Sequence, residues 1–281
     1  MRYVLLFLGL SGLFGACIED QEGCLDLAAT NFDVGADIEC VEPCCEYPTL
    51  RLQVQHRVVS AELPDSLQRF RYDSVYLLGS PPDSIRFDYF RFYLHDVALD
   101  FADGGTAQVA ERLPIFSPTA GELTVVDDVM RVAVDEFGLQ ALGEIRPAGT
   151  LTGLRLHVGL PEEWGRVAPG DYPAGHPLRV GQAEPTYDTL AGYSSLAAAF
   201  RVPPGAPDST VVRFLGDSPV SLPLDVPLEL RRGFDLVITL RLNYHRLFAD
   251  LNLAQATNGT LTGALIDRLP NSIELVDVSQ D

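Results

Sequence analysis

The chain has 281 residues and a formal net charge of −19, with 39 acidic residues against 20 basic ones, and every basic residue is arginine. Such a surface repels phosphate groups, which argues against nucleic acid as a partner. Hydrophobic residues make up 47% of the chain. That share is enough for a sizeable core, and the length suits one large β domain with a small appendage.

Residues 1–16 have the pattern of a signal peptide. A single Arg2 precedes an apolar run over residues 3–14, which is shorter than the roughly 20 residues that span a bilayer. The following Gly-Ala-Cys resembles a bacterial lipobox, which implies cleavage before Cys17 and a lipid on its sulfur. The alternative is an ordinary secretory signal. Under either interpretation the mature protein is exported, and with the lipid it is anchored to a membrane in the periplasm, at the outer membrane or at the cell surface.

Residues 17–48 form an acidic module rich in cysteine. With a lipid on Cys17, four cysteines remain, Cys24, Cys40, Cys44 and Cys45, and they allow two disulfides in three pairings. An oxidising compartment favours disulfides over thiolate metal ligands. The adjacent Cys44 and Cys45 do not easily bond to each other, so each is expected to pair with one of the other two. A segment this short needs such bonds to fold, and we interpret it as a stapled spacer.

The same module carries oxygen-bearing side chains at short intervals: Asp26, Asn31, Asp33 and Asp37. Their spacing does not match an EF-hand loop. Oxygen ligands of this kind are those that Ca²⁺ prefers, but the same residue types also form Asx turns and helix caps. The sequence leaves calcium binding and turn formation as alternatives.

From residue 49 the pattern becomes that of β-strands. The stretch 49–59, TLRLQVQHRVV, alternates apolar and polar side chains and places His56 on the apolar face. Further strands are predicted at 84–101, 122–134, 149–160, 193–202, 209–216, 220–230 and 234–248, and short helices at 135–142 and 244–253. Many strands with turn signals and few helices indicate an antiparallel sandwich or barrel, formed by residues 49–281. The polar stretch 161–193 is predicted to be a long ordered loop, where β scaffolds commonly carry function.

No motif for enzymatic chemistry is present: the sequence lacks a G-x-S-x-G elbow, a P-loop, an H-E-x-x-H pair and a dinucleotide-binding glycine fingerprint. We therefore expect no enzyme. Histidine is the commonest ligand for copper and zinc. His56 is interpreted as either a hydrogen-bonded core residue or a metal ligand, and His176 lies in the long loop. His157 is predicted to face solvent, and His95 and His245 carry no specific signal.

Several stretches resemble, in the same order, the MbnP-like family of exported copper-binding proteins linked to methanobactin and copper uptake. They are LQVQHRV at 52–58, FDYFRFYLHDVALDF at 87–101, LTGLRLHVGLPEE at 151–163, GHPL at 175–178, TYDTLAGY at 186–193 and FDLVITLRLNYHRLFADLNL at 234–253. The resemblance covers about residues 49–270 and implies a β-sandwich. The preceding module is similar to short cysteine-rich segments of bacterial lipoproteins.

The sequence departs from the family at places that serve copper there. Asp188 and Leu190 stand where members carry a W-x-W pair, and Phe214 stands where an H-x-G histidine is expected. His56 and His176 are then the residues that remain as copper ligands. The sequence thus predicts a copper-binding or copper-delivering lipoprotein with a copper-handling partner. The alternative is a metal-free surface interaction protein on the same scaffold.

Overall fold

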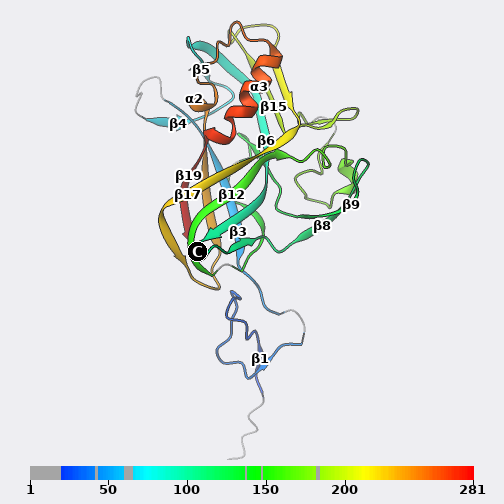
Figure 1. Ribbon diagram of the computed structural model, residues 1–281, viewed down its shortest axis with the longest axis vertical. Coiled ribbons are helices and arrows are strands. Elements are labelled where there is room, and N and C mark those ends of the chain that lie inside the picture. The colour runs from blue at the N-terminus through cyan, green and yellow to red at the C-terminus, as the bar shows by residue number, and fades with distance from the viewer. Residues whose placement is uncertain (1–19, 42–43, 60–65, 137, 147, 182–183) are drawn as a thin grey trace, which may run out of the picture.

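The computed structural model describes residues 20–41, 44–59, 66–136, 138–146, 148–181 and 184–281. The predicted signal peptide and Cys17 lie outside these residues. The prediction of an all-β sandwich with a long loop insertion and a stapled N-terminal segment is confirmed. Two large sheets pack face to face, and the N-terminal segment extends from one end of them (Figure 1).

The larger sheet is built around one long strand, β6. It contains eight strands in the order β16-β15-β6-β12-β17, with β5, β7 and β10 also paired to β6, and all of its pairs are antiparallel. The strands are β5 (Val75–Leu78), β6 (Asp83–Phe101), β7 (Thr106–Gln108), β10 (Met130–Ala133), β12 (Gly149–Leu160), β15 (Leu196–Arg201), β16 (Thr210–Phe214) and β17 (Gly216–Leu230). Because β6 pairs with five of the other strands, it is the central strand of this sheet.

The smaller sheet has five strands in the order β11-β3-β18-β19, with β4 also paired to β3. They are β3 (Thr49–Val59), β4 (Leu67–Arg69), β11 (Gln140–Glu144), β18 (Leu236–Asn243) and β19 (Ile273–Gln280). One pair in this sheet departs from the antiparallel arrangement, because β3 and β18 run parallel. Both strands start at the same end of the molecule, where the Thr49 amide donates to Asp235 Oδ1 at 2.8 Å.

The core lies between the sheets, and helices close one end of it. The predicted alternation of β3 is confirmed, since Leu50, Leu52, Val54, His56 and Val58 are all buried. The predicted helix at 244–253 is present as one turn, α2 (Tyr244–Leu247), followed by the unpredicted α3 (Asn258–Arg268) and the 3₁₀ turn η2 (Pro270–Ser272). The predicted helix at 135–142 is wrong: a turn there leads into β11, which buries Leu142 against the core.

The described residues of the insertion, 161–181 and 184–193, are irregular, as predicted. Within them the regular elements are the turn η1 (Pro169–Asp171) and the two-residue strands β13 (Tyr187–Asp188) and β14 (Gly192–Tyr193). It packs on the outer face of the larger sheet beside the hairpin of β8 (Arg112–Ser117) and β9 (Gly121–Val126) (Figure 1). A second apolar cluster forms there around Tyr93, Trp164 and Tyr172.

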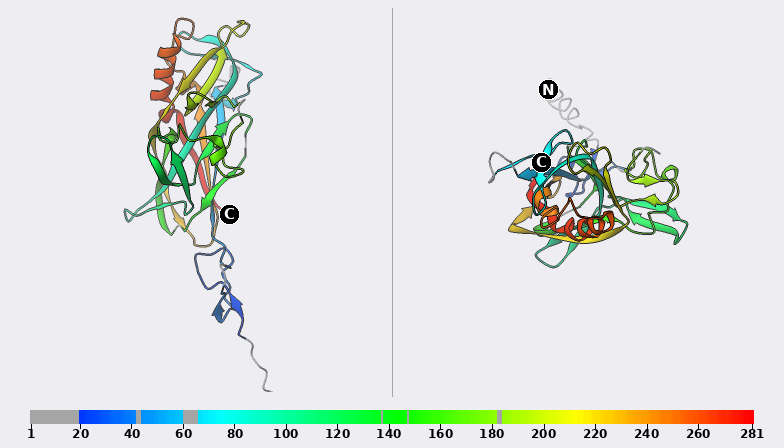
Figure 2. Two further views of the ribbon diagram at one scale, coloured as in Figure 1. Left: turned by 90° about the vertical axis from the view of Figure 1, so that its right-hand side faces the viewer. Right: turned by 90° about the horizontal axis from the view of Figure 1, so that it is seen from above.

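The N-terminal module holds two disulfides, Cys24–Cys45 and Cys40–Cys44, so neither adjacent cysteine bonds to the other, as expected. Its short strands β1 (Glu22–Gly23) and β2 (Ile38–Glu39) are parallel. The guanidinium of Arg146 lies 3.5 Å from the centre of the Tyr47 ring and joins the module to the sandwich. The module extends from one end of the sandwich (Figure 2). Within the described residues, no helix is long and apolar enough to cross a membrane.

Candidate metal centre

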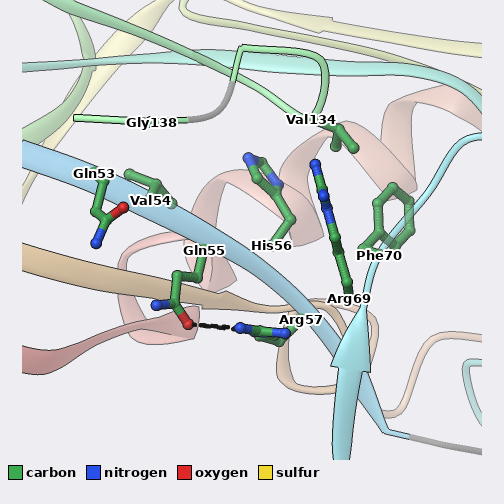
Figure 3. A pocket seen from close by; sticks show the side chains of 9 residues that line it. All are labelled: Gln53, Val54, Gln55, His56, Arg57, Arg69, Phe70, Val134 and Gly138. Atoms are coloured by element: carbon green, nitrogen blue, oxygen red, sulfur yellow. Dashed lines mark hydrogen bonds between the residues drawn. The ribbon is translucent and has the colours of Figure 1, made fainter. Parts of the chain in front are cut away.

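His56 is a buried residue of β3. Its Nδ1 lies 3.0 Å from the Tyr244 hydroxyl, and among the described residues its Nε2 has no hydrogen-bond partner. Burial lowers the pKa of His56 to about 3, so the imidazole is neutral. It lines a hollow whose described lining holds no other histidine, cysteine or carboxylate (Figure 3). Within the described residues, the structure therefore brings no second metal-binding side chain to His56.

His176 lies in the insertion, and protein groups face both of its ring nitrogens. Its Nδ1 accepts the Leu178 amide at 3.1 Å, and its Nε2 lies 3.1 Å from Asp127 Oδ1. The ring stacks on Tyr172, with 4.6 Å between centres. No contact found among the described residues joins His176 to His56, so the two predicted copper ligands have separate surroundings.

The oxygen-bearing residues of the module each accept a hydrogen bond within the module. Asp26 accepts the Ala28 amide and the Tyr47 hydroxyl, Asn31 accepts the Glu46 amide, Asp33 accepts the Gly35 amide, and Asp37 accepts the Gln21 amide. In the part of the chain that the structure describes, they do not form a group close enough to share an ion. The bonds from Ala28 to Asp26 and from Gly35 to Asp33 are the turn-forming contacts that the sequence offered as the alternative to calcium, whereas the others join distant parts of the module.

Two of the three departures from the family pattern, Asp188 and Phe214, have structural roles here. Asp188 Oδ1 accepts the amides of Leu190 and Ala191 and closes the tight turn between β13 and β14. Leu190 is 89% exposed at that turn. Phe214 ends β16 and lies against Gly216, where its ring would meet an added Cβ.

A different cluster gathers metal-ligating side chains on the outer face of the larger sheet. His95 of β6, His157 of β12 and Asp217 of β17 each place a ligand atom within 4.8 Å of the others. Asp217 Oδ2 lies 2.5 Å from His157 Nδ1 and 3.7 Å from His95 Nε2. His157 stands opposite His95 in one ladder and diagonal to Asp217 in the other, the two cross-strand relations that bring side chains together.

A β-bulge in β6 sets the face that His95 occupies. The register with β12 shifts between Arg155 and His157, and Asp96 adopts the left-handed conformation at φ 51°. In β6, Phe90, Phe92 and Leu94, which directly precede the bulge, are buried at even positions, whereas Val97 and Leu99, which follow it, are buried at odd positions. The bulge thus lets β6 keep one face in the core on both sides of the site.

A buried carboxylate holds this bulge. Asp128 is 1% exposed, and its two oxygens accept the backbone amides of Asp96 at 2.9 Å and Val97 at 2.6 Å. Without it, both amides would lack a partner at a buried kink, which is costly. Asp128 therefore acts on the cluster through the backbone next to His95.

His95 is covered by the insertion. Trp164 packs against its ring at 5.2 Å between centres, and the His95 side chain is only 6% exposed. Burial, together with the nearby His157, lowers the pKa of His95 to about 4. The imidazole is thus neutral, and its buried Nε2, which has no hydrogen-bond partner among the described residues, faces the carboxylate of Asp217.

Two imidazoles and one carboxylate form a donor set for a borderline divalent metal such as copper or zinc. Ligand atoms around one such ion lie about 3.3 Å apart when the bonds are about 2.0 Å long, so small side-chain movements would complete the site. His157 is one-third exposed, which leaves an open side for entry. The sequence carries no specific signal for His95 and predicts only that His157 faces solvent, because the strand register alone brings the two opposite each other.

The comparisons with known proteins return one structural likeness. The chain is similar to the solved structure of MbnP from Methylosinus trichosporium, with a TM-score of 0.42 and 13% identity, over 83% of this chain and 99% of that chain. A scan of protein-family models finds no match, and a search of curated proteins finds no relative.

Proposed function

We propose that the protein binds copper outside the cytoplasm and holds the ion between His95, His157 and Asp217. The observation that carries this proposal is the buried Nε2 of His95, which has no hydrogen-bond partner within the described part of the chain and faces a carboxylate that His157 also contacts. A buried imidazole nitrogen without a hydrogen bond is a costly arrangement, and a metal ion would satisfy it.

Copper is favoured over other metals by the ligands and by affinity. Imidazole and carboxylate donors bind first-row divalent ions in an order that peaks at Cu²⁺. The net charge of −19 raises the local concentration of cations around the protein. The charge argument applies equally to zinc, and only the affinity order places zinc below copper, so zinc is the competitor to include in a titration.

The proposal includes export and a membrane anchor through a lipid on Cys17, supported by the sequence pattern of residues 1–17. An anchored copper-binding protein would hand its ion to, or receive it from, a copper-handling partner protein. His157 and Asp217, which lies near the start of β17, are the partly exposed members of the cluster that such a partner could reach.

Copper titration with metal analysis tests the site. We expect the purified protein to bind one copper ion per chain, and His95→Ala or His157→Ala to weaken binding by about 100-fold or more. The double variant His56→Gln/His176→Gln is the matched control, because it removes two histidines outside the cluster, and it should bind like the wild type.

The other outcomes of that titration discriminate between the alternatives. Full binding in His95→Ala and His157→Ala, with loss in the double variant, would return the site to His56 and His176. Absence of copper from the wild-type protein after copper exposure would favour the metal-free interaction protein, for which the exposed Leu190 at the tip of the insertion is the natural contact.

A further inference from the structure

Carboxylates lie near both nitrogens of the His157 ring. Its Nδ1 lies 2.5 Å from Asp217 Oδ2, and its Nε2 lies 4.0 Å from Asp96 Oδ2. Asp217 belongs to β17 and Asp96 to β6, the two strands that flank β12 in the larger sheet. The ring therefore stands between two negative charges, of which the proposed metal site uses only one.

The metal-binding role of His157 requires one particular tautomer. The nitrogen beside Asp217 is Nδ1, so Nδ1 is the atom that would bind an ion shared with this carboxylate. A nitrogen that binds a metal carries no hydrogen, and in a neutral imidazole the hydrogen is then on the other nitrogen. Metal binding thus needs the tautomer of His157 with hydrogen on Nε2, the atom that faces Asp96.

Without an ion, Asp217 favours the opposite tautomer. Its contact with His157 Nδ1 is a hydrogen bond, and an ionised carboxylate can only accept, so it draws the hydrogen to Nδ1. An acceptor beside Nε2 would oppose this preference. In metal sites, the far nitrogen of a ligating histidine commonly donates to a carboxylate, which fixes the tautomer and the ring orientation. Among the described residues, Asp96 is the carboxylate within 4.0 Å of Nε2.

The Asp96 side chain is held in a suitable place by its neighbours. The side-chain amide of Gln108 on β7 donates to Asp96 Oδ1 at 2.7 Å, which leaves Oδ2 as the oxygen nearest His157. The left-handed backbone of Asp96, with φ 51°, is a conformation that aspartate, asparagine and glycine tolerate better than most residues. The side chain is 44% exposed, so water screens its charge in part and a moderate effect is expected.

We propose that Asp96 is a positioning residue of the copper site, which accepts the hydrogen on His157 Nε2 and thereby leaves Nδ1 free for the ion. A side-chain movement of about 1 Å would shorten the 4.0 Å separation to a hydrogen bond. This inference rests on the proposed copper site, but the tautomer of His157 can be measured without any metal.

Nitrogen NMR of the metal-free protein tests the effect of Asp96 on the ring. At about pH 9, above the ordinary pKa of histidine, we expect a larger share of His157 with hydrogen on Nε2 in the wild type than in Asp96→Gly. Glycine adopts the left-handed conformation without strain, so this variant removes the carboxylate and keeps the bulge, which urea unfolding checks. Equal shares of the two tautomers in both proteins would overturn the proposal.

Copper titration tests the consequence for the site. We expect Asp96→Gly to bind copper about tenfold more weakly than the wild type, and Asp96→Asn, which keeps an oxygen acceptor, to recover part of the loss. Asp225→Asn is the matched control, because it removes the same charge from an exposed position on β17, and it should bind like the wild type.

The titration also separates this proposal from the copper site itself. Copper binding that is lost in His95→Ala but unchanged in Asp96→Gly would overturn the role of Asp96 and leave the copper site standing. Absence of copper binding by the wild type would overturn both, even if the tautomer of His157 responded to Asp96 as expected.

Discussion

His56 shows how one buried side chain couples the fold to pH. Its ring is enclosed by Tyr244 and lies near Arg69 and Asp135, and burial is the main cause of its lowered pKa, with the Arg69 charge acting in the same direction and Asp135 opposing it. The folded state takes up a proton only near pH 3, whereas an unfolded histidine does so near pH 6.5. Between these values the unfolded state binds more protons, so acid favours unfolding.

We predict that the contribution of His56 to the free energy of unfolding is constant above about pH 6.5 and falls by about 1.4 kcal/mol per pH unit as the pH drops toward 3. Urea unfolding at pH 7, 5.5 and 4.5, compared with His56→Gln, isolates this contribution, because other groups titrate in both proteins. Parallel pH profiles for the two proteins would show that His56 is not buried as a neutral ring.

At the scale of single elements, the bulge in β6 connects stability with the candidate site. Asp128 accepts hydrogen bonds from two backbone amides at that bulge. Even-numbered residues just before the bulge and odd-numbered residues after it face the core. The Asp128 carboxylate is 1% exposed and stabilises the backbone of the bulge by accepting these amides. We expect its removal to change the position of His95, which is next to Asp96 in the chain.

We predict that Asp128→Ala lowers the free energy of unfolding by about 1–3 kcal/mol and weakens copper binding by about tenfold or more. Asp128→Asn retains one acceptor and should recover part of both losses. Urea unfolding and copper titration of the two variants provide the measurements. Unchanged copper affinity in a destabilised Asp128→Ala protein would limit Asp128 to a purely structural role.

The β3 strand could be predicted residue by residue, because its alternation is a local property. The parallel pairing of β3 with β18 could not, since it depends on two segments about 190 residues apart meeting at one end of the sandwich. The candidate metal site could not be predicted from the sequence for the same reason. His95, His157 and Asp217 lie on three different strands. The bulge that sets their register has no recognisable pattern in the local sequence. The observed disulfide pairing is one of those that remain when the adjacent Cys44 and Cys45 do not bond to each other.

At the scale of the whole molecule, the N-terminal module fixes how the sandwich would stand on a membrane. Arg146 packs on Tyr47 and reaches Asp26 at 4.0 Å, and the Ile145 amide donates to the Pro48 carbonyl at 2.8 Å. The helices α2 and α3 lie at the opposite end (Figure 1). A lipid on Cys17 would thus hold that end away from the bilayer.

We predict that the wild-type protein fractionates with membranes and that Cys17→Ser releases it, because a lipid chain supplies the apolar area that the rest of the chain does not expose to a bilayer. Mass spectrometry of the N-terminal peptide should show the added lipid only in the wild type. Retention of Cys17→Ser in the membrane fraction would contradict a lipid anchor at this residue.

The strand β17 lies at the open edge of the larger sheet and carries Pro219, Pro223 and Pro227. Proline has no amide hydrogen to offer to an added strand. Proteins tethered to one membrane meet in two dimensions, where their local concentration is high and their long axes are aligned, conditions that promote edge-to-edge sheet extension. The prolines remove donors from that edge, so copies held on one membrane by the proposed lipid would crowd together without joining their sheets.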